Sequence, residues 1–417
     1  MAELQPRILV WHSFPLKAGG GPSGYLYNYH IFLESQGLGA SVDFLGDICD
    51  ISGLSKESRG MIQRGFDKAV DAFGRITERS QARHAARQSY CRARRKFRRD
   101  WPMHPKLAPY DIIHFHSSWE LVKSSAMLRR FRGKVILSSH SPLPWHVEYL
   151  DSLSAKGRND AISPRLEKLL EAIDREAFER ADFVMSPCQS AMDGYGRHWG
   201  IFDTLLAGKA TIHIPTAIAM RQASPLADFR KSLGLEENAQ LFLFGGRHNE
   251  AKGYDLLVKA AEALFAASPR ACVLVVGHEE PLHGPGHPRW IELGWRGDMA
   301  AIMASCDWLV LPNREAYFDL VLLEAMAAGL PAVVSAVGGN LHFSELEGRG
   351  LLFHRPGEEA SLAECLQAAA SMDLGQLSSF RQNCKERVLS AHGFDQYHRS
   401  YQNALCKVFA KAGECLT

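Results

Sequence analysis

Short apolar runs alternate with helical patterns along this chain. Each run spans three or four residues and is bounded by turn-forming residues. Runs of this kind, with helices between them, are typical of parallel strands that are buried on both faces. The predicted strands are Ile8 to Trp11, Ile112 to Phe115, Val135 to Leu137, Phe183 to Met185, Leu241 to Phe244, Val273 to Val276, Trp308 to Leu311 and Ala332 to Val334. The pattern therefore predicts an α/β fold that occurs twice.

One interruption of this pattern predicts the boundary between two domains. Prolines, polar residues and one short helical pattern occupy Pro215 to Gln240. A chain of 417 residues is also too long for one ordinary core, so domains of roughly 200 residues are expected. We place a first domain at residues 1–225 and a second at 226–395. The helical pattern from Tyr397 to Ala410, within 396–417, is a candidate to cross back to the first domain.

Residues 51–105 fit neither domain's pattern, because they are basic and poor in strand-forming residues. On a helix, a single apolar stripe beside arginine-rich faces would comprise Ala86, Tyr90, Ala93, Phe97 and Trp101. Two interpretations remain open for Arg79 to Trp101. The segment is either a basic amphipathic helix that meets an anionic membrane peripherally, or a helix packed on its own domain with a solvated basic face.

The composition is that of a globular protein, with 46% hydrophobic and 23% charged residues and no low-complexity tract. The net charge of +2 hides a polarity, because residues 1–222 carry +8 and the remainder −6. This polarity favours an anionic ligand or surface for the first half of the chain. It is too mild to indicate nucleic acid as a partner.

The cysteines and the lengths of the apolar runs indicate a cytoplasmic location. Nine cysteines are scattered from Cys49 to Cys415 without a C-x-x-C pair or metal-ligand spacing, which fits reduced thiols. The first apolar stretch is too short for a signal peptide, and no run of about 18 apolar residues predicts a membrane span. We expect a cytoplasmic protein, with peripheral contact at the inner membrane face if the basic helix meets lipid.

The segment LFLFGGRHNEAKGYDLL carries the first candidate chemistry. A predicted strand ends at Gly245 and Gly246, and Arg247 and Lys252 follow before Gly253 opens a helical pattern. Glycines let backbone amides approach an anion, and a helix N-terminus favours negative charge. A guanidinium and an ammonium together would neutralise a diphosphate. Many strand-to-helix loops carry Arg and Lys, so this segment alone does not separate a phosphate site from an ordinary loop.

The segment NREAYFDLVLLEAMAAGLPAVVSAVGGN is the second candidate. Asp319, Leu320 and Val321 lie where a helix begins, so their amides are placed to face phosphate oxygens. Glu324, about one turn into the helix, is suited to accept hydrogen bonds from two vicinal ribose hydroxyls. Because a glutamate on a helix usually just faces solvent, this segment is also ambiguous by itself.

Taken in this order, the motifs resemble the carboxy-terminal domain of GT-B glycosyltransferases, specifically the large retaining glycosyltransferase family 4. The matching pieces within residues 240 to 360 are GGRHNEAKG, ELGWRGDMAAIMASCDWLVLPN, YFDLVLLEAMAAGLPAVVSAVGGN and GRGLLFHRPGE. The first half matches more loosely, through KAGGGPSGYLYNY, YDIIHFH and VILSSH. The resemblance implies two Rossmann-like domains whose parallel sheets face a central cleft.

The resemblance also implies roles for single residues. Arg247 and Lys252 would bind the phosphates of a nucleoside-diphosphate sugar and act in catalysis, and Glu324 would bind the ribose. His140 would reach the transferred sugar, although an ordinary histidine at a strand end is the alternative. His116 is a candidate for binding the acceptor, with a structural role favoured instead. The other donor-binding candidates are Gly20, Gly21, Gly246, Trp295, Arg296, Asp319, Leu320 and Val321.

One departure from the family's pattern concerns the sugar. The family usually shows two glutamates eight positions apart, whereas Ala316 stands eight before Glu324 and Glu315 stands nine before it. The glycine that commonly follows the phenylalanine is Asp319 here. A one-residue shift moves a side chain by about 3.8 Å, more than a hydrogen bond tolerates unless the loop is rebuilt. Either Glu315 reaches the sugar hydroxyls along a different loop path and serves catalysis, or the donor sugar is held differently.

The resemblance implies a glycosyl transfer that retains the anomeric configuration, to a glycan, lipid-linked or small-molecule acceptor. No D-x-D sequence occurs, and we expect no metal or cofactor beyond the nucleotide sugar, because Arg247 and Lys252 would neutralise the diphosphate. In a same-face attack the departing phosphate takes the acceptor's proton, so no enzymic nucleophile is required. Two alternatives remain, a GT-B sugar-nucleotide epimerase and a non-catalytic paralogue that binds the nucleotide sugar.

Overall fold

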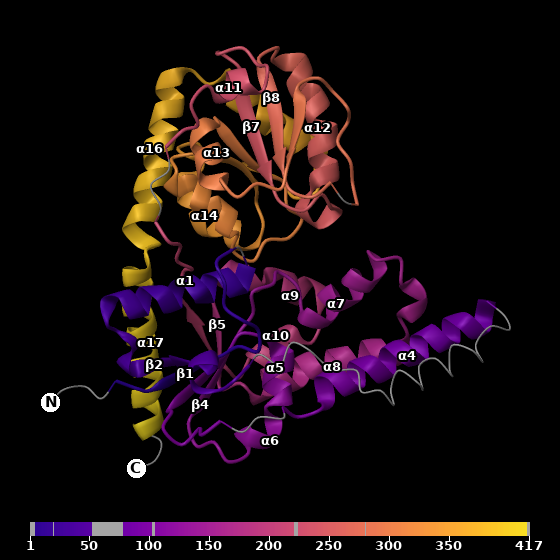
Figure 1. Cartoon of the computed structure of the whole chain (residues 1–417), viewed down its shortest axis with the longest axis vertical. Helices are drawn as coiled ribbons and strands as arrows, with labels where there is room; N and C mark the ends of the chain where they lie inside the picture. Colours follow the sequence, from indigo (N-terminus) through magenta and orange to yellow (C-terminus); the bar gives the residue numbers. More distant parts are fainter. Residues whose placement is uncertain are drawn as a thin grey trace. The chain divides into compact units, whose positions relative to one another are not determined.

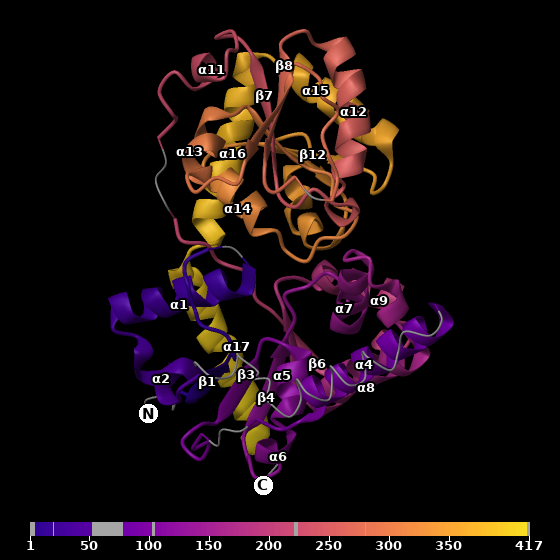
Figure 2. The ribbon, with the colours of Figure 1, turned by 45° about the vertical axis from the view of Figure 1, so that its right-hand side comes forward.

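The computed structural model describes residues 5–19, 21–51, 78–101, 105–220, 224–279 and 281–414. The chain forms two compact units, each with its own parallel sheet (Figures 1 and 2). The first unit comprises Met1–Ser186, Tyr195–His213 and Ser400–Thr417. The second unit comprises Pro187–Gly194 and Ile214–Arg399.

The sheet of the first unit has six strands within the described residues, in the order β2-β1-β3-β4-β5-β6, and neighbouring strands are parallel. In its register, Ile8 lies between Val42 and Ile112. The strands are β1 (Ile8–Trp11), β2 (Val42–Phe44), β3 (Ile112–Phe115), β4 (Lys134–Ser138), β5 (Phe183–Ser186) and β6 (Ala210–His213). The helices are α1 (Gly21–Gln36), η1 (Gly39–Ser41), α2 (Leu45–Ile48), α4 (Glu78–Arg98), α5 (Ser118–Lys123), α6 (Ser125–Leu128), α7 (Trp145–Ser154), η2 (Asn159–Ala161), α8 (Pro164–Arg180), η3 (Gln189–Met192), α9 (Asp193–His198), α10 (Phe202–Leu206) and α17 (Phe394–Glu414), of which η3, α9 and α17 lie partly or wholly in the second unit.

The sheet of the second unit also has six parallel strands among the described residues, in the order β12-β11-β10-β7-β8-β9. The strands are β7 (Gln240–Gly245), β8 (Ala271–Val276), β9 (Trp290–Gly294), β10 (Trp308–Leu311), β11 (Ala332–Ser335) and β12 (Leu351–His354). The helices are α11 (Phe229–Ser232), η4 (Glu250–Lys252), α12 (Tyr254–Ala267), α13 (Met299–Ser305), α14 (Leu320–Ala327), η5 (Gly338–Leu346), α15 (Glu359–Ser371) and α16 (Leu374–Ala391).

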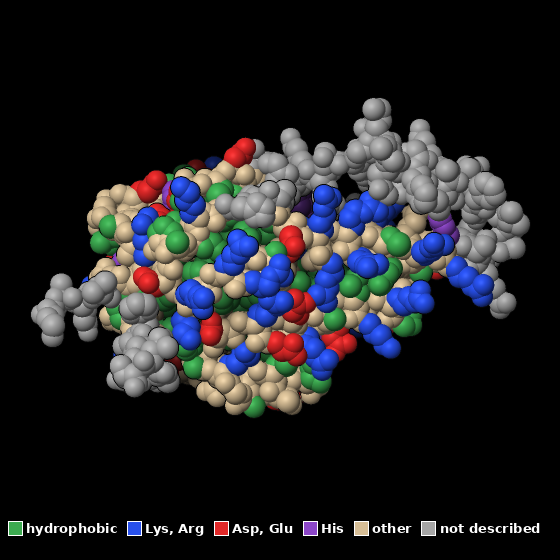
Figure 3. Space-filling model, turned by 90° about the horizontal axis from the view of Figure 1, so that it is seen from below, with side chains coloured by type: hydrophobic (Ala, Val, Ile, Leu, Met, Phe, Trp, Pro, Cys, Tyr) green, Lys and Arg blue, Asp and Glu red, His purple; other side chains and the backbone are tan. Residues whose placement is uncertain are grey.

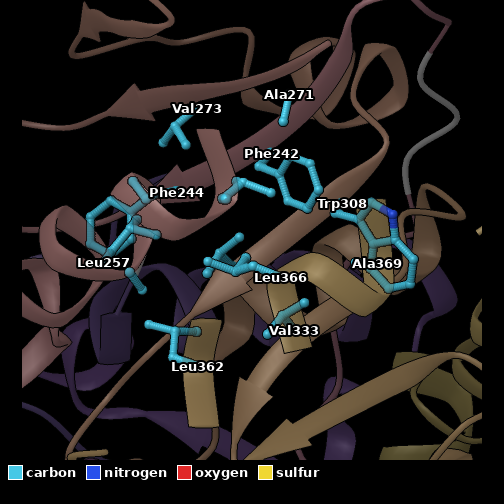
Figure 4. Close-up of a cluster of buried hydrophobic side chains, with 14 of the residues drawn as sticks. Phe242, Phe244, Leu257, Ala271, Val273, Trp308, Val333, Leu362, Leu366 and Ala369 are labelled. Carbon is cyan, nitrogen blue, oxygen red and sulfur yellow. The ribbon is translucent and has the colours of Figure 1, made fainter. Parts of the chain in front are cut away.

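A core of aromatic and aliphatic side chains fixes the second sheet against its helices. Phe242, Val273 and Trp308 from the sheet pack with Leu257 of α12 and Leu366 of α15, and all are buried (Figure 4). Burying such a side chain stabilises the fold by about 1.5 to 3 kcal/mol. The core holds the carboxyl ends of β7 and β10 in place, and both motifs singled out in the sequence begin there.

The predicted α/β fold is confirmed, and each of the predicted strands lies on a strand of the structure. The strands that the pattern missed are β2, β6, β9 and β12, which are the four edge strands of the described sheets. An edge strand pairs on one side only and tolerates polar residues, so it lacks the continuous apolar run of a central strand. In β6, for example, Ala210 and Thr211 are exposed.

The chain passes from the first unit to the second after His213, whereas the sequence pattern places the domain boundary near residue 225. The His392 ring donates to the carbonyl of Thr216 at 2.9 Å, and the amide of Ile218 donates to the carbonyl of His392 at 3.0 Å. These bonds attach the stretch around Thr216 and Ile218 to the second unit. At the other end of the chain, residues from Ser400 onward belong to the first unit.

Helix α4 lies within the basic insertion, and its apolar stripe is directed into its own unit. Ala93, Phe97 and Trp101 are buried, and the Phe97 ring meets those of Trp145 and Tyr149 edge-to-face with centroids 4.7 and 5.5 Å apart. Ala86 and Tyr90 of the same stripe are half-buried, so the helix packs on its own unit mainly through its C-terminal half. Residues 52–77 and 102–104 and the side chain of Arg79 lie outside what the structure describes.

The other face of α4 carries exposed basic side chains. Lys and Arg side chains appear in Figure 3 toward the side on which α4 extends in Figure 1. We define the basic face as the exposed Lys and Arg side chains of α4 and of the residue that follows it. They are Arg83, Arg87, Arg92, Arg94, Arg95, Lys96, Arg98 and Arg99. Within the described part of the chain, no helix is long and apolar enough to span a bilayer.

Candidate functional site

The loop from β7 to α12 in the second unit follows a path that only glycine permits at one point. Gly253 has φ +66°, and a Cβ on it would lie 1.8 Å from the carbonyl oxygen of Pro312. The Asn249 side chain accepts a hydrogen bond of 3.0 Å from the amide of Lys252, which closes the short helix η4. This loop, with Arg247 and Lys252, therefore packs directly on the backbone at the end of β10.

Arg314 ties this loop to the loop between β10 and α14. Its guanidinium donates two hydrogen bonds to Asp255, at 2.7 and 2.6 Å, and a further one to the carbonyl of Glu250. Its backbone amide donates to the carbonyl of Ala251 at 3.1 Å. A bidentate arginine contact is geometrically specific, so the two loops are held in a fixed relation.

Lys252 and Asp319 meet in this fixed arrangement. The ammonium of Lys252 donates to Asp319 Oδ1 at 2.9 Å, and the amide group of Asn313 donates to Asp319 Oδ2. The side chains of Lys252 and Asp319 are 28% and 13% exposed, respectively. Arg247, by contrast, is exposed on the loop. The structure thus brings one predicted cation onto a predicted donor-site residue and leaves the other facing solvent.

The N-terminus of α14 begins at this same place, directly after Asp319, and no side chain caps it among the described residues. Asp319 is the N-cap residue, but its side chain accepts no hydrogen bond from the helix amides. Leu320 and Val321 begin the helix, and Glu324 is exposed on its fifth residue. Backbone amides at a helix N-terminus, beside a lysine, form an arrangement that accommodates a phosphate group.

The loop that carries Glu315 rests on two glycines. A Cβ on Gly338 would lie 1.8 Å from the carbonyl oxygen of Ala316, and one on Gly339 would lie 2.0 Å from that of Tyr317. The amide of Gly339 also donates to Ala316 at 3.1 Å. The backbone that follows Glu315 is therefore closely packed, and Glu315 itself is half-buried.

The carboxyl ends of β8 and β9 lie beside that of β7. The amide of Gly246 donates to the carbonyl of Val276, and the amide of Gly277 donates to that of Gly294, both at 3.0 Å. Trp295, which follows, is 70% exposed, and Arg296 pairs with Asp298 at 2.6 Å. A large, exposed indole beside glycine backbone is suited to stack on a flat ring such as a base.

A buried polar group that the sequence pattern does not predict lies behind this loop. His248 is fully buried and stacks on Tyr254, with ring centroids 4.3 Å apart. The Tyr254 hydroxyl donates to Glu292 at 2.6 Å, and burial raises its pKa. Burial lowers the pKa of His248, so its imidazole is neutral at pH 7. The stack on Tyr254 holds His248 in place, and His248 directly follows Arg247.

Three histidines gather at the ends of β3 and β4 in the first unit. His116 Nδ1 lies 2.8 Å from His140 Nε2, and the rings of His114 and His116 are 4.1 Å apart. His114 also bonds the hydroxyls of Tyr401 and Ser138, each at 2.8 Å. Burial lowers the pKa of all three, so they are neutral and can exchange hydrogen bonds without repelling one another.

The glycine-rich loop after β1 leads into α1, whose first residue, Gly21, has φ +70°. Gly20, its predicted partner in the donor site, lies outside the described residues. The loop starts at Ser13, whose amide donates to the carboxylate of Glu120 at 2.9 Å. Among the described residues, no three or more His, Cys, Asp or Glu side chains are grouped to hold a metal ion.

Two family models match this chain. The model "Glycosyl transferases group 1" matches residues 239–371, which include both loops of the second-unit site. The model "Glycosyltransferase Family 4" matches residues 57–204 of the other half. The chain belongs to the GT-B glycosyltransferases of the family 4 type.

A curated relative of this GT-B glycosyltransferase is the D-inositol 3-phosphate glycosyltransferase of Stackebrandtia nassauensis. It is 33% identical over 157 residues, which are 33% of this chain and 35% of the relative. The alignments to the first curated relatives cover about a third to a half of those proteins' own length.

Solved structures match this chain over nearly its whole length. Sucrose-phosphate synthase from Thermosynechococcus elongatus has a TM-score of 0.62 at 19% identity, covering 98% of this chain and 100% of that one. Anabaena HepE in complex with UDP and glucose has a TM-score of 0.58 at 17% identity, covering 96% and 100%. At these identities the likeness shows the shared fold.

Proposed function

We propose that the protein transfers a sugar from a nucleoside-diphosphate sugar to an acceptor. The observation that carries this proposal is the arrangement of Arg247, Lys252 and the uncapped N-terminus of α14 at the ends of the adjacent strands β7 and β10. A sugar diphosphate leaving group carries about two negative charges, and these grow as the glycosidic bond breaks. Two cations and the helix amides, all at the carboxyl ends of these strands, would stabilise that negative charge.

The donor is proposed to bind through the second unit. Phosphate oxygens contact Arg247, Lys252 and the amides of Leu320 and Val321, and Glu324 accepts hydrogen bonds from the ribose hydroxyls. The base lies against the backbone from Gly294 to Arg296, with Trp295 beside it. A uridine nucleotide is the first donor to test, because HepE was crystallised with UDP and glucose.

The proposed reaction needs no metal ion and retains the anomeric configuration. The acceptor hydroxyl attacks from the face that the diphosphate leaves, and a phosphate oxygen takes its proton. Arg247 and Lys252 stabilise the charge left on the diphosphate. His140 donates a hydrogen bond to the transferred sugar and is oriented by His116, which lies 2.8 Å away. Glu315 is proposed to accept hydrogen bonds from sugar hydroxyls.

The acceptor is proposed to be a glycan, a lipid-linked sugar or a small polyol, bound mainly by the first unit. The relative from Stackebrandtia is named for D-inositol 3-phosphate, which makes a phosphorylated polyol a sensible member of an acceptor panel. The basic face of α4 is proposed to bring the protein to an anionic membrane by charge alone, and the protein then works at the cytoplasmic surface.

The test is nucleoside diphosphate release from a panel of UDP-, GDP-, ADP- and dTDP-sugars, with and without acceptors. Release that depends on an acceptor, together with a sugar-linked product, supports the transferase. Proton NMR of the new anomeric centre then reports retention or inversion, and added EDTA reports the need for a metal. Tight binding without release would indicate a non-catalytic binder, and a changed sugar without release would indicate an epimerase.

A further inference from the structure

Asp319 places a negative charge against one of the two cations proposed to bind the donor. Its carboxylate contacts Lys252 at 2.9 Å through Oδ1 and the buried Asn313 through Oδ2. The carboxylate is thus held on two sides in a mostly dry position. Together, Arg247, Lys252 and Asp319 carry a formal charge of +1 rather than +2.

The local backbone does not depend on this carboxylate. Asp319 has φ −70°, a conformation open to any residue, and its side chain does not cap α14. The loop is already attached through Arg314, which bonds Ala251 and Asp255. The charge of Asp319 therefore acts on Lys252 and on whatever binds there.

We propose that Asp319 is a specificity-determining residue that weakens the binding of free nucleoside diphosphate more than that of the nucleotide sugar. This rests on the proposed function. In the transfer, the bond between the anomeric carbon and the phosphate oxygen breaks, its electrons stay on the diphosphate, and a bond from the acceptor oxygen forms. The acceptor's proton passes to the phosphate and then to water, because a terminal phosphate has a second pKa near about 6.

The product therefore carries about one more negative charge than the donor at the end that faces Lys252. A carboxylate already bound to Lys252 repels that added charge, and it does so strongly in a site that excludes water. Asp319 thus favours the substrate over the spent diphosphate and limits product inhibition. Since Lys252 has three N–H donors, it can contact a donor phosphate while still bonded to Asp319.

The test is isothermal titration of the full chain with UDP, GDP, ADP and UDP-glucose. Asp319→Asn keeps the shape and an acceptor oxygen for Lys252 and removes the charge. We expect it to bind the nucleoside diphosphate on the order of tenfold more tightly, and UDP-glucose no more than about threefold more tightly. Asp319→Gly, which the φ angle allows, should also bind the nucleoside diphosphate more tightly. This second variant shows whether the effect comes from the lost charge or from the side-chain amide that Asn introduces.

The matched control is Glu358→Gln. Glu358 is the N-cap residue of α15 in the same unit and pairs with Arg355 at 2.6 Å, so the charge change is the same and no affinity should change. An unchanged or weaker affinity of the Asp319 variants for the diphosphate would overturn the role of Asp319 alone, and so would an equal gain for both ligands. A wild-type protein that binds none of these nucleotides would contradict the proposed function itself.

Discussion

The carboxylate of Glu120 accepts hydrogen bonds from both the backbone amide and the hydroxyl of Ser13. Glu120 is fully buried in α5, which follows β3, and Ser13 begins the glycine-rich loop after β1. The pair therefore connects the starts of two loops at neighbouring strand ends. Burial raises the pKa of Glu120 to about 7, although the hydrogen bonds from Ser13 act in the opposite direction.

The first prediction is that Glu120 makes the protein less stable as the pH rises from about 4.5 to about 7. Below this window the carboxyl is protonated in both the folded and the unfolded state. Within it the unfolded state releases its proton first, so the free energy of unfolding falls, by up to about 3 kcal/mol, and above about pH 7 it levels off.

Urea unfolding across this window checks the prediction with Glu120→Gln, which keeps an acceptor oxygen for Ser13 but cannot ionise. The variant should show a flatter dependence of the free energy of unfolding on pH. Asp151→Asn, at an exposed position of α7, is the control and should keep the wild-type slope. An identical slope in the Glu120 variant would show that this carboxyl ionises normally.

The second prediction concerns the contact between Gly253 and Pro312. Gly253→Ala brings a Cβ to 1.8 Å from a carbonyl oxygen, so we expect a loss of more than about 3 kcal/mol of stability together with weaker nucleotide binding. Gly286→Ala is the matched control, because Gly286 also has a positive φ of +67° but nothing within 4 Å of its Cβ. It should cost only about 1 to 2 kcal/mol. Equal losses in thermal unfolding would mean that strain, and not the close approach, decides the loop's path.

The third prediction concerns the two cations. Arg247→Ala and Lys252→Ala should each lower kcat/KM by a factor corresponding to about 2 to 4 kcal/mol, because each removes a charge-assisted contact to the leaving group. Initial rates of nucleoside diphosphate release measure this. Lys259→Ala, at an exposed position of α12, serves as control. A change within a factor of about two in the Arg247 or Lys252 variant would remove that residue from the phosphate site, since such contacts are worth far more than this.

The fourth prediction concerns Glu324. Glu324→Gln should raise the KM for the donor about tenfold with little change in kcat, because a ribose contact is the same in the ground state and the transition state. Glu262→Gln, exposed on α12, should leave both constants unchanged. A fall in kcat at constant KM would instead place Glu324 beside the reacting atoms.

The fifth prediction concerns the basic face of α4. Since Ala93, Phe97 and Trp101 of its apolar stripe are buried, we expect binding to vesicles that contain anionic lipid and none to neutral vesicles. Replacing Arg92, Arg94 and Arg95 by Gln should weaken the binding on the order of 100-fold, at about 1 kcal/mol per charge. Vesicle flotation of the wild type and variant measures this.

The control for the vesicle experiment removes the same charge from the second unit. Lys231, Lys259 and Arg270 are exposed there, and their replacement by Gln should leave vesicle binding unchanged if the basic face is the contact. Equal recovery of the wild type from anionic and neutral vesicles would contradict membrane contact through charge.

The sequence predicts the centres of both sheets because a central strand is apolar on both faces. The edge strands escape this pattern, as in β2, where Asp43 sits between two buried residues and bonds Tyr110 at 2.9 Å. For α17, which begins in the second unit and ends in the first, the sequence predicts only a helix. Its attachment depends on contacts such as that between Tyr401 and His114, which lie far apart in the sequence.

The candidate site was predicted as a set of residues but not as a set of contacts. Both Lys252 and Asp319 were assigned to the donor site, yet their mutual ion pair depends on how Arg314 joins two loops. His248 could not be singled out among 18 histidines, because its importance comes from stacking on Tyr254. The pairing of His116 with His140 likewise depends on the register of β3 with β4.

The return of the last residues to the first unit has a consequence for synthesis on the ribosome. Tyr401 and Leu405 are buried there, and the Tyr401 ring packs on Tyr29 and His114. The surface of the first unit that Tyr401 and Leu405 cover stays exposed until the whole second unit has been translated. At about 5 to 20 residues per second, the nascent first unit waits on the order of 10 to 40 s with an incomplete core. It is therefore a natural client for chaperones that bind apolar surface, although most of it emerges before the second unit.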